Sequence, residues 1–221
     1  NLGWNYKYKA SDEKPFHVFA GDFDQSGTFD IALGYYLQDD VLYPVRGRQC
    51  SSEQMPSLAE KFPTYTDYGK ASIFEVYGES LKDALHYEVR TFSSSVLLNQ
   101  GNGQFERRDL PPEAQISPVN GIILHDFDGD QKTDLLLAGN LFVSEVETGR
   151  ADAGRGLYLK GNGDGTFEPV GVRESGIYLP GDVKDLRLIK TAAPGEVLVL
   201  VSQNNDRVRV LKWVGGKSIV K

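Results

Sequence analysis

Cysteine is almost absent from this sequence, since Cys50 is the only one among 221 residues. An internal disulfide is therefore impossible, and a disulfide-stapled scaffold is excluded. The count does not identify the compartment, because it excludes such a scaffold but not secretion. Long apolar runs are also lacking, and none approaches the roughly 18–20 residues that a membrane-spanning helix needs. We therefore expect no transmembrane segment.

Clustered positive charge is the third feature that the sequence lacks. It has 24 Lys and Arg against 31 Asp and Glu, a formal net charge of −7, and its longest basic cluster is the pair Arg107 and Arg108. A surface that binds nucleic-acid phosphates needs grouped lysines and arginines, so we expect no nucleic-acid partner. The 40% of hydrophobic residues is typical of a globular protein and predicts a folded chain with a substantial core.

Two acidic segments, 22–30 and 126–134, lie in the same sequence surroundings. Each one follows a short apolar segment and is followed by another, and these four segments are 18–20, 31–33, 122–124 and 135–137. Each unit therefore has the order apolar strand, acidic loop, apolar strand. A unit that recurs in this way is typical of a repeat architecture such as a β-propeller.

A glycine-rich turn is the second repeated element. Residues 99–105 and 160–167 both follow a short apolar strand and contain Gly-Asn-Gly or Gly-Asp-Gly steps. Because Gly and Asn tolerate the positive φ that tight hairpin turns require, we predict a β-hairpin at each place.

The segment from about 52 to 85 does not have the pattern of strands. Capping residues and helical spacing predict a helix over about 51–62, a second over 67–77 and a short turn at 80–84. The two acidic loops lie about twice a typical ~50-residue blade apart, and an insertion accounts for the excess. We interpret the segment as a helical insertion within one blade that covers a sheet edge or face, with partner binding as the alternative use.

The C-terminal part continues the β pattern without an acidic loop. Strands are predicted at 185–189, 196–201 and 207–213, and residues 190–195 between the first two form a plain turn. The third unit is therefore expected to have kept its strands and lost its metal site.

The start of the chain matches a later point of the repeat. Asn1 and Leu2 correspond to Asn140 and Leu141, which follow the second strand of the second unit, and the chain does not begin with Met. By this spacing, another acidic loop would begin upstream of Asn1. We therefore expect the chain to be the C-terminal portion of a longer propeller.

Alternate positions of the two acidic loops carry oxygen ligands, and alternate residues of a curled loop converge on one cation. The predicted ligands are Asp22, Asp24, Ser26, Thr28 (through its carbonyl) and Asp30 in the first loop, and Asp126, Asp128, Asp130, Lys132 (through its carbonyl) and Asp134 in the second. A hard cation with about six to eight oxygen ligands is Ca²⁺, whereas Mg²⁺ needs a tighter octahedron and Zn²⁺ prefers Cys or His. Two calcium sites are therefore predicted, since the carboxylates would otherwise repel one another.

The two loops differ in their sharp-turn positions. The first has Gly27 at position six, whereas the second has Gln131 there and Gly129 at position four. The second loop has four carboxylates against three in the first, so its greater negative charge is expected to bind the cation more tightly. The backbone geometry at Gln131 stays an open question. The alternative is that each loop is a solvated acidic turn without an ion.

Other catalytic chemistry has less support in the sequence. His17 and His125 occupy different repeat positions, so we expect no shared metal or catalytic role for them. Cys50 lies in no nucleophile motif. Paired carboxylates for glycoside hydrolysis stay open because acids are abundant, although the recognisable acidic clusters are already assigned as calcium ligands.

These motifs resemble a known repeat. DFDQSGTFDIALG (22–34) and DFDGDQKTDLLLAG (126–139) are similar to FG-GAP/VCBS repeats, the calcium-loop blades of integrin-α-type propellers. The longer stretches 1–24, 61–78 and 135–167 resemble the C-terminal part of large bacterial, Bacteroidetes-type VCBS-repeat proteins related to the ASPIC/UnbV group. The resemblance implies a secreted or outer-membrane-surface location and a propeller of about seven or eight blades.

The fold expected is therefore all-β: a partial β-propeller of about three blades over 1–221, with the helical insertion at about 52–85. The function expected is a calcium-stabilised, non-enzymatic binding or scaffold module of a cell-envelope or secreted protein, with a protein or glycan partner in a larger envelope assembly. The alternative is a carbohydrate-binding or glycan-processing component with its site on the propeller face. A pocket with convergent polar groups away from the loops would favour that alternative.

Overall fold

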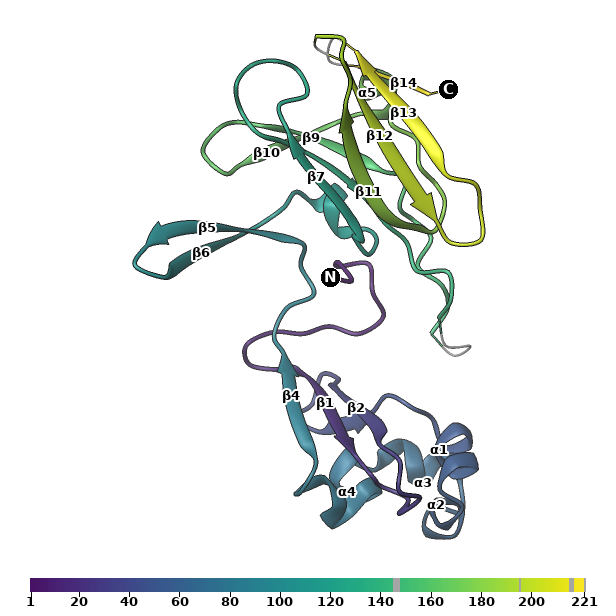
Figure 1. The fold of residues 1–221 in the computed structure, drawn as a ribbon. Helices are drawn as coiled ribbons and strands as arrows, with labels where there is room; N and C mark the ends of the chain where they lie inside the picture. The colour runs from purple at the N-terminus through teal and green to yellow at the C-terminus, as the bar shows by residue number, and fades with distance from the viewer. Residues whose placement is uncertain (145–147, 195, 215–216, 221) are drawn as a thin grey trace. The chain divides into compact units, whose positions relative to one another are not determined.

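The computed structural model describes residues 1–144, 148–194, 196–214 and, by their backbone alone, 217–220. The chain divides into two compact units, a small unit of Tyr8–Phe92 and a large unit of Asn1–Lys7 and Ser93–Lys221 (Figure 1). Strands outnumber helices, and every strand pairing in the described residues is antiparallel. The predicted all-β class is confirmed at this level, while the propeller arrangement stays a prediction.

The small unit contains one four-stranded sheet with the order β3-β2-β1-β4. Its strands are β1 (Phe16–Gly21), β2 (Asp30–Tyr36), β3 (Leu42–Pro44) and β4 (Leu85–Val89). The two strands predicted around the first acidic loop are β1 and β2, and they are confirmed. After β3 the chain crosses to the other edge of the sheet, so β4 pairs with β1 and not with β3.

Five short helical segments occupy the connection from β3 to β4, so the predicted helical character of this stretch is confirmed, while its role as an insertion within a blade stays a prediction. They are α1 (Arg48–Gln54), α2 (Ser57–Lys61), α3 (Tyr65–Lys70), α4 (Ile73–Tyr77) and the 3₁₀ helix η1 (Gly78–Leu81). The single helix predicted over 51–62 is wrong. Met55 precedes Pro56 and has a non-helical ψ of 86°, because the proline ring disfavours the helical conformation of the residue before it.

The single helix predicted over 67–77 is also wrong, because two capping signals divide it. Thr64 accepts a hydrogen bond from the backbone N–H of Asp67, so α3 begins earlier than predicted. Ser72 and Glu75 then form a capping box, with Ser72 Oγ accepting from Glu75 N at 3.1 Å and Glu75 Oε2 from Ser72 N at 2.7 Å. Each cap satisfies N–H groups that have no partner inside the helix, and it therefore starts a new helix.

The helices supply one wall of the core of the small unit. Ile73 of α4 and Leu81 of η1 are buried against Phe19, Ala32 and Leu42 of the sheet. A second cluster packs the helices against one another and contains Leu58, Tyr68, Ala71 and Val76. The insertion therefore covers a sheet face, as one of its two predicted uses requires.

The large unit contains a hairpin and two four-stranded meanders. The hairpin is β5 (Ser95–Gly101) and β6 (Gln104–Asp109), and the 3₁₀ helix η2 (Pro112–Gln115) follows it. The first meander is β7 (Gly121–His125), β8 (Asp134–Ala138), β9 (Leu157–Gly161) and β10 (Phe167–Val170). After the short helix α5 (Val172–Ser175), the second is β11 (Val183–Lys190), β12 (Glu196–Gln203), β13 (Arg209–Val214) and β14 (Lys217–Val220).

Most of the predicted strands of this unit are confirmed. The two glycine-rich turns form the hairpins β5–β6 and β9–β10, with positive φ at Asn102, Gly103 and Gly163, among others. Strand β14 was not predicted. In the predicted turn 190–195, Lys190 ends β11 and Gly195 lies outside the described residues.

Strand β8 lies at the centre of the large unit, with all five of its residues buried. One face packs into a core shared with the second meander, which includes Leu136, Val199 and Trp213. The other face, through Leu135 and Leu137, packs in a cluster with Leu110 and Ala114. A strand that is covered on both faces reads as a continuous apolar run, which explains the Leu-Leu-Leu sequence.

Strand order in the two meanders is consecutive, β10-β9-β8-β7 and β11-β12-β13-β14, as it is in a propeller blade. The small sheet departs from that order because β4 lies beside β1. Among the described residues, no helix is both long and apolar enough to cross a lipid bilayer.

Candidate metal centres

The first acidic loop joins β1 to β2 and gathers three carboxylates. One oxygen each of Asp22, Asp24 and Asp30 lies within 4.8 Å of the others. Asp22 accepts hydrogen bonds from the backbone N–H groups of Ser26 and Gly27, both at 2.9 Å. The loop therefore curls around its own acidic side chains, as the alternation of ligand positions predicts.

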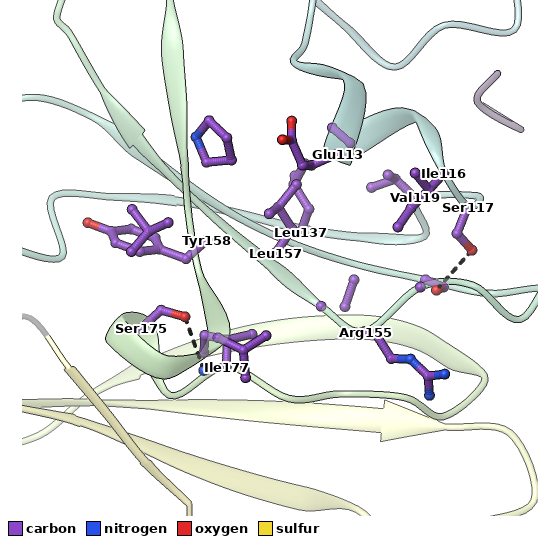
Figure 2. A pocket seen from close by; sticks show the side chains of 18 of the residues that line it. Glu113, Ile116, Ser117, Val119, Leu137, Arg155, Leu157, Tyr158, Ser175 and Ile177 are labelled. Atoms are coloured by element: carbon purple, nitrogen blue, oxygen red, sulfur yellow. Dashed lines mark hydrogen bonds between the residues drawn. The ribbon is translucent and has the colours of Figure 1, made fainter. Parts of the chain in front are cut away.

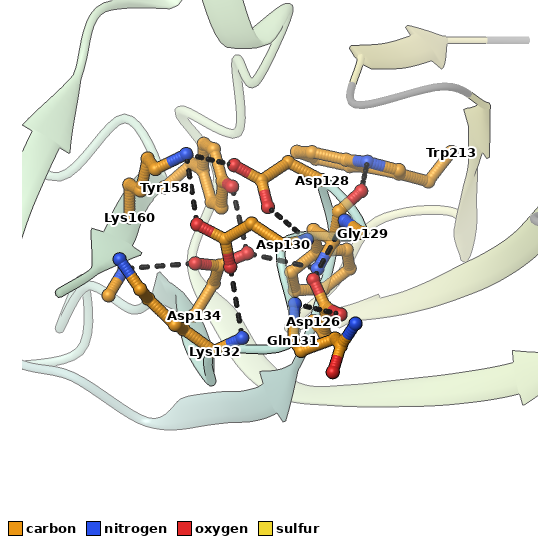
Figure 3. A network of polar contacts seen from close by, with 12 residues as sticks. Asp126, Asp128, Gly129, Asp130, Gln131, Lys132, Asp134, Tyr158, Lys160 and Trp213 are labelled. Atoms are coloured by element: carbon orange, nitrogen blue, oxygen red, sulfur yellow. Dashed lines mark hydrogen bonds and ion pairs between the residues drawn. The ribbon is translucent and has the colours of Figure 1, made fainter. Parts of the chain in front are cut away.

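The second acidic loop joins β7 to β8 and repeats this arrangement (Figure 3). One oxygen each of Asp126, Asp128 and Asp130 lies within 4.8 Å of the others. Asp126 accepts from the backbone N–H groups of Gly129 at 2.7 Å and Gln131 at 2.9 Å. Both loops thus use the carboxylate at position one to hold the backbone three to five residues further on.

The backbone of the two loops turns at the same two positions. Gln25 and Gly27, at positions four and six of the first loop, have φ of 60° and 85°. Gly129 and Gln131, at the same positions of the second loop, have φ of 83° and 68°. The glycine and the glutamine have therefore exchanged places within one left-handed turn geometry. This answers the open question about Gln131, since it adopts the conformation that Gly27 has in the first loop.

Positions five and seven follow the same scheme. The side chains of Ser26 and Asp130 accept from the backbone N–H of the residue two positions on, Thr28 at 3.4 Å and Lys132 at 2.9 Å. Hydrogen bonding from Ser26 lowers the pKa of the Asp24 carboxyl, and that group is therefore ionised at neutral pH. Thr28 and Lys132, the two predicted carbonyl ligands, lie in the exposed part of their loops.

Position nine differs between the loops. In both, one carboxylate oxygen accepts from the backbone N–H of position two, Phe23 to Asp30 at 3.1 Å and Phe127 to Asp134 at 2.9 Å. Asp30 belongs to the acidic cluster, and its second oxygen accepts from Gln54. Asp134 does not belong to the cluster that the other three acids form.

Asp134 is instead directed into the core and is fully buried. Besides Phe127, it accepts hydrogen bonds from the Tyr158 hydroxyl and the Gly161 backbone N–H, both at 2.9 Å. Burial, together with the hydrogen bond to Asp134, raises the pKa of the Tyr158 hydroxyl, which therefore stays protonated as the donor. The predicted ligand Asp134 thus connects the loop to the neighbouring strand β9.

Lys160 is a residue of this site that the sequence analysis missed. Its ammonium contacts Asp128 Oδ2 and lies 3.2 Å from Asp130 Oδ2 (Figure 3). These two contacts raise the pKa of Lys160. The pKa of Asp130 is lowered, chiefly by the Lys132 backbone N–H and then by Lys160. Only the pairing of β8 with β9 brings Lys160 to the loop, and this pairing has no local signal in the sequence.

The second residue of each loop is an aromatic anchor. The Phe127 ring packs 4.5 Å from the Trp213 ring, centroid to centroid, and the Trp213 indole N–H donates to the Phe127 carbonyl at 2.9 Å. Phe23 packs 5.2 Å from Tyr77 of the helical insertion. Both loops are therefore fixed to the core directly beside their first carboxylate.

A cavity of about 330 Å³ lies in the large unit, away from the acidic loops (Figure 2). Its lining is mainly apolar and includes Val119, Leu137, Leu157 and Ile177. The hydroxyl of Ser117, another lining residue, donates to the Asn140 side chain at 2.6 Å. Such a cavity fits an apolar group.

The charged groups of the lining do not converge. The side chains of Glu113 and Arg155 lie on different sides of the cavity (Figure 2). The Ser175 hydroxyl donates to the Gly171 carbonyl at 3.1 Å. The two charged side chains of the described lining therefore do not form a pair.

Comparisons with known proteins add no relatives. No protein-family model matches the chain. No curated protein matches it. No solved structure matches it. The resemblance to FG-GAP/VCBS repeats therefore rests on the motifs alone.

Proposed function

We propose that this chain is a calcium-stabilised, non-enzymatic binding or scaffold module of the FG-GAP/VCBS type. In this proposal each acidic loop holds one Ca²⁺, and the sheets are blades of a partial propeller. The proposal includes a secreted or cell-envelope location and a protein or glycan partner, both of which rest on the sequence resemblance.

The observation that carries the proposal is the structural equivalence of the two loops. They share the same left-handed turn positions, and in both the backbone N–H of position six donates to the carboxylate of position one. Each loop also gathers three acids, from positions one, three and nine in the first and from positions one, three and five in the second. A solvated acidic turn has no reason to keep this geometry twice with glycine and glutamine exchanged. Carboxylates held this close repel one another, and a hard divalent cation with oxygen ligands removes that cost.

Calcium would act structurally in both loops. Each loop connects two adjacent strands of a sheet, β1–β2 or β7–β8, and its second residue is anchored in the core. An ion bound by the three gathered acids of either loop would therefore fix the end of a strand pair. Its free energy of binding would add to the free energy of folding.

The cavity supports binding more than catalysis. Glycoside hydrolysis needs two carboxylates about 5–10 Å apart on either side of the bond that is cleaved. Among the described residues that line this cavity, Glu113 is the only acid. The glycan-processing alternative therefore has no specific support from the described residues.

Calcium titration by calorimetry and thermal melting with EDTA test the proposal. Wild type is expected to bind two Ca²⁺ per chain and to melt at a higher temperature with calcium than with EDTA. Asp24→Asn and Asp128→Asn are each expected to remove one site, because an amide lacks the charge of the ligand that it replaces. Exposed acids outside the loops, Asp40→Asn and Asp152→Asn, are the matched controls and should keep both sites.

Absence of heat on titration, together with identical melting curves in calcium and EDTA, would count against structural calcium. Loss of a site in a control variant would count against the assignment to the loops.

A further inference from the structure

A histidine pair and a glutamate lie together on the sheet of the small unit. In the register of β1 with β4, His17 is opposite Glu88 and Phe19 is opposite His86. Residues that are opposite each other, or two apart on one strand, share a face of an antiparallel sheet. One ligand atom each of His17, His86 and Glu88 lies within 4.8 Å of the others.

The hydrogen bonding of His17 is incomplete. Its Nδ1 lies 2.7 Å from His86 Nε2, so one ring donates to the other. Its Nε2 is buried and has no hydrogen-bond partner among the described residues, and the side chain as a whole is only 7% exposed. Because it is Nδ1 that faces His86, Nδ1 and not the buried Nε2 is the nitrogen available to an ion between the two rings.

The two imidazole rings are held in place by packing. His86 stacks on Phe19 at 4.3 Å and on His17 at 5.0 Å between ring centroids. Tyr36 of the neighbouring strand meets the His17 ring edge-on at 5.7 Å. These contacts orient the two rings, whereas Glu88 and His86 are exposed at the surface. One side of the cluster is therefore formed by the buried His17 ring, and the other side, with His86 and Glu88, is open to solvent.

We propose that His17, His86 and Glu88 form a binding site for a transition-metal ion of the Zn²⁺ class. Two imidazoles and one carboxylate are a donor set of zinc sites that keep one position open for water or a further ligand. Ca²⁺ prefers oxygen ligands, so this site would differ in metal preference from the acidic loops. The inference is independent of the calcium proposal, because none of its ligands belongs to those loops.

The geometry needs a small adjustment to receive an ion. With Zn–N distances of about 2.0–2.1 Å, a tetrahedral ion holds two nitrogens about 3.3 Å apart. The 2.7 Å separation of His17 and His86 is shorter, so the ion would replace their hydrogen bond as the exposed His86 ring moves outward. Glu88 would exchange its contact with Arg90, now 2.9 Å between Oε2 and Nη2, for the ion. Since Arg90 is well exposed, it can return to water.

Cobalt and zinc titrations of the calcium-saturated protein test this site. Co²⁺ is expected to give the intense visible absorption of a four-coordinate site, at one ion per chain, and Zn²⁺ should displace it. His86→Gln and Glu88→Gln change exposed residues and are expected to weaken Zn²⁺ binding at least tenfold. Melting curves of both variants check that they remain folded.

His125→Gln and Cys50→Ser are the matched controls, because they remove the remaining histidine and the single thiol. Both should bind Zn²⁺ as wild type does, and so should the calcium-loop variant Asp24→Asn. A wild-type Co²⁺ spectrum like that of the free aqueous ion would overturn the assignment, and so would His86→Gln binding that equals wild type. A tenfold loss in either control would place the metal elsewhere.

Discussion

Replacement of Gln131 by glycine is expected to stabilise the large unit. Gln131 has a φ of 68°, in the left-handed region where every residue with a Cβ is strained. Its side chain is exposed, and its backbone N–H, which bonds Asp126, is kept by glycine. The substitution therefore removes the strain and leaves the loop hydrogen bonds intact.

The magnitude follows from two opposing effects. A left-handed conformation costs a residue with a Cβ about 1–2 kcal/mol. Glycine also makes the unfolded chain more flexible, so folding loses more conformational entropy. This lowers the free energy of unfolding by about 0.4–1 kcal/mol and offsets part of the gain. The net stabilisation expected for Gln131→Gly is therefore about 0.5–1 kcal/mol. Gly129→Ala should destabilise by a similar amount, since Gly129 has a φ of 83° and open space where a Cβ would lie.

Intrinsic tryptophan fluorescence measures this effect in one unit alone. The two tryptophans, Trp4 and Trp213, both belong to the large unit, so their denaturation curve reports its unfolding. Gln25→Gly in the small unit is the matched control and should leave that curve unchanged. If Gln131→Gly left the free energy of unfolding unchanged or lowered it while Gly129→Ala lowered it, the equivalence of the two turn positions would be refuted.

Three further substitutions test single contacts. Lys160→Met removes the ammonium from Asp128 and Asp130, so calorimetry should show several-fold tighter calcium binding at the second loop and no change at the first. Asp134→Asn turns an amide N–H₂ toward buried donors, and the tryptophan-detected free energy of unfolding should fall by about 1–3 kcal/mol. Ser72→Ala removes the capping box of α4 and should cost the small unit about 1 kcal/mol, measured by helical circular dichroism.

Much of the strand pattern was predictable because its signals are local. Apolar segments of strand length flank each acidic loop, and the glycine-rich turns specify hairpins through their tolerance of positive φ. That the acids at positions one and three lie close together in both loops also follows from spacing alone. Apolar spacing alone does not give the helix boundaries, because Pro56 and the Ser72 capping box divide the segments that this spacing joins.

The remaining features depend on contacts between distant parts of the chain. His17 meets His86 only because the insertion returns the chain to the free edge of β1, and no spacing along the sequence indicates that crossing. Lys160 reaches the second loop only through the pairing of β9 with β8. Asp134 has the sequence position of a ligand, but its direction is set by donors on β9. The histidine contact, the position of Lys160 and the direction of Asp134 all depend on which strands pair. Local sequence signals do not specify this pairing.

Strand β9 supplies partners to the carboxylates of the second loop, and this affects how much each loop needs an ion for stability. It supplies the Lys160 ammonium to Asp128 and Asp130, and its Tyr158 hydroxyl and Gly161 N–H to Asp134. The charge of the second loop is thus partly neutralised by the protein itself. In the described part of the first loop, the side chain that reaches its carboxylates from another element is the neutral amide of Gln54, which donates to Asp30. The first loop is therefore expected to need calcium more, although the second has more carboxylates.

Separate probes of the two units test this ranking. Helical circular dichroism reports mainly the small unit, which contains α1 to α4, and tryptophan fluorescence reports the large unit. EDTA is expected to lower the melting temperature of the helical signal by more than that of the fluorescence signal, because unneutralised carboxylates remain in the first loop. Lys160→Met should reduce this difference, since the second loop then loses its internal cation. A larger EDTA shift in the wild-type fluorescence signal would show instead that carboxylate count outweighs the contribution of β9.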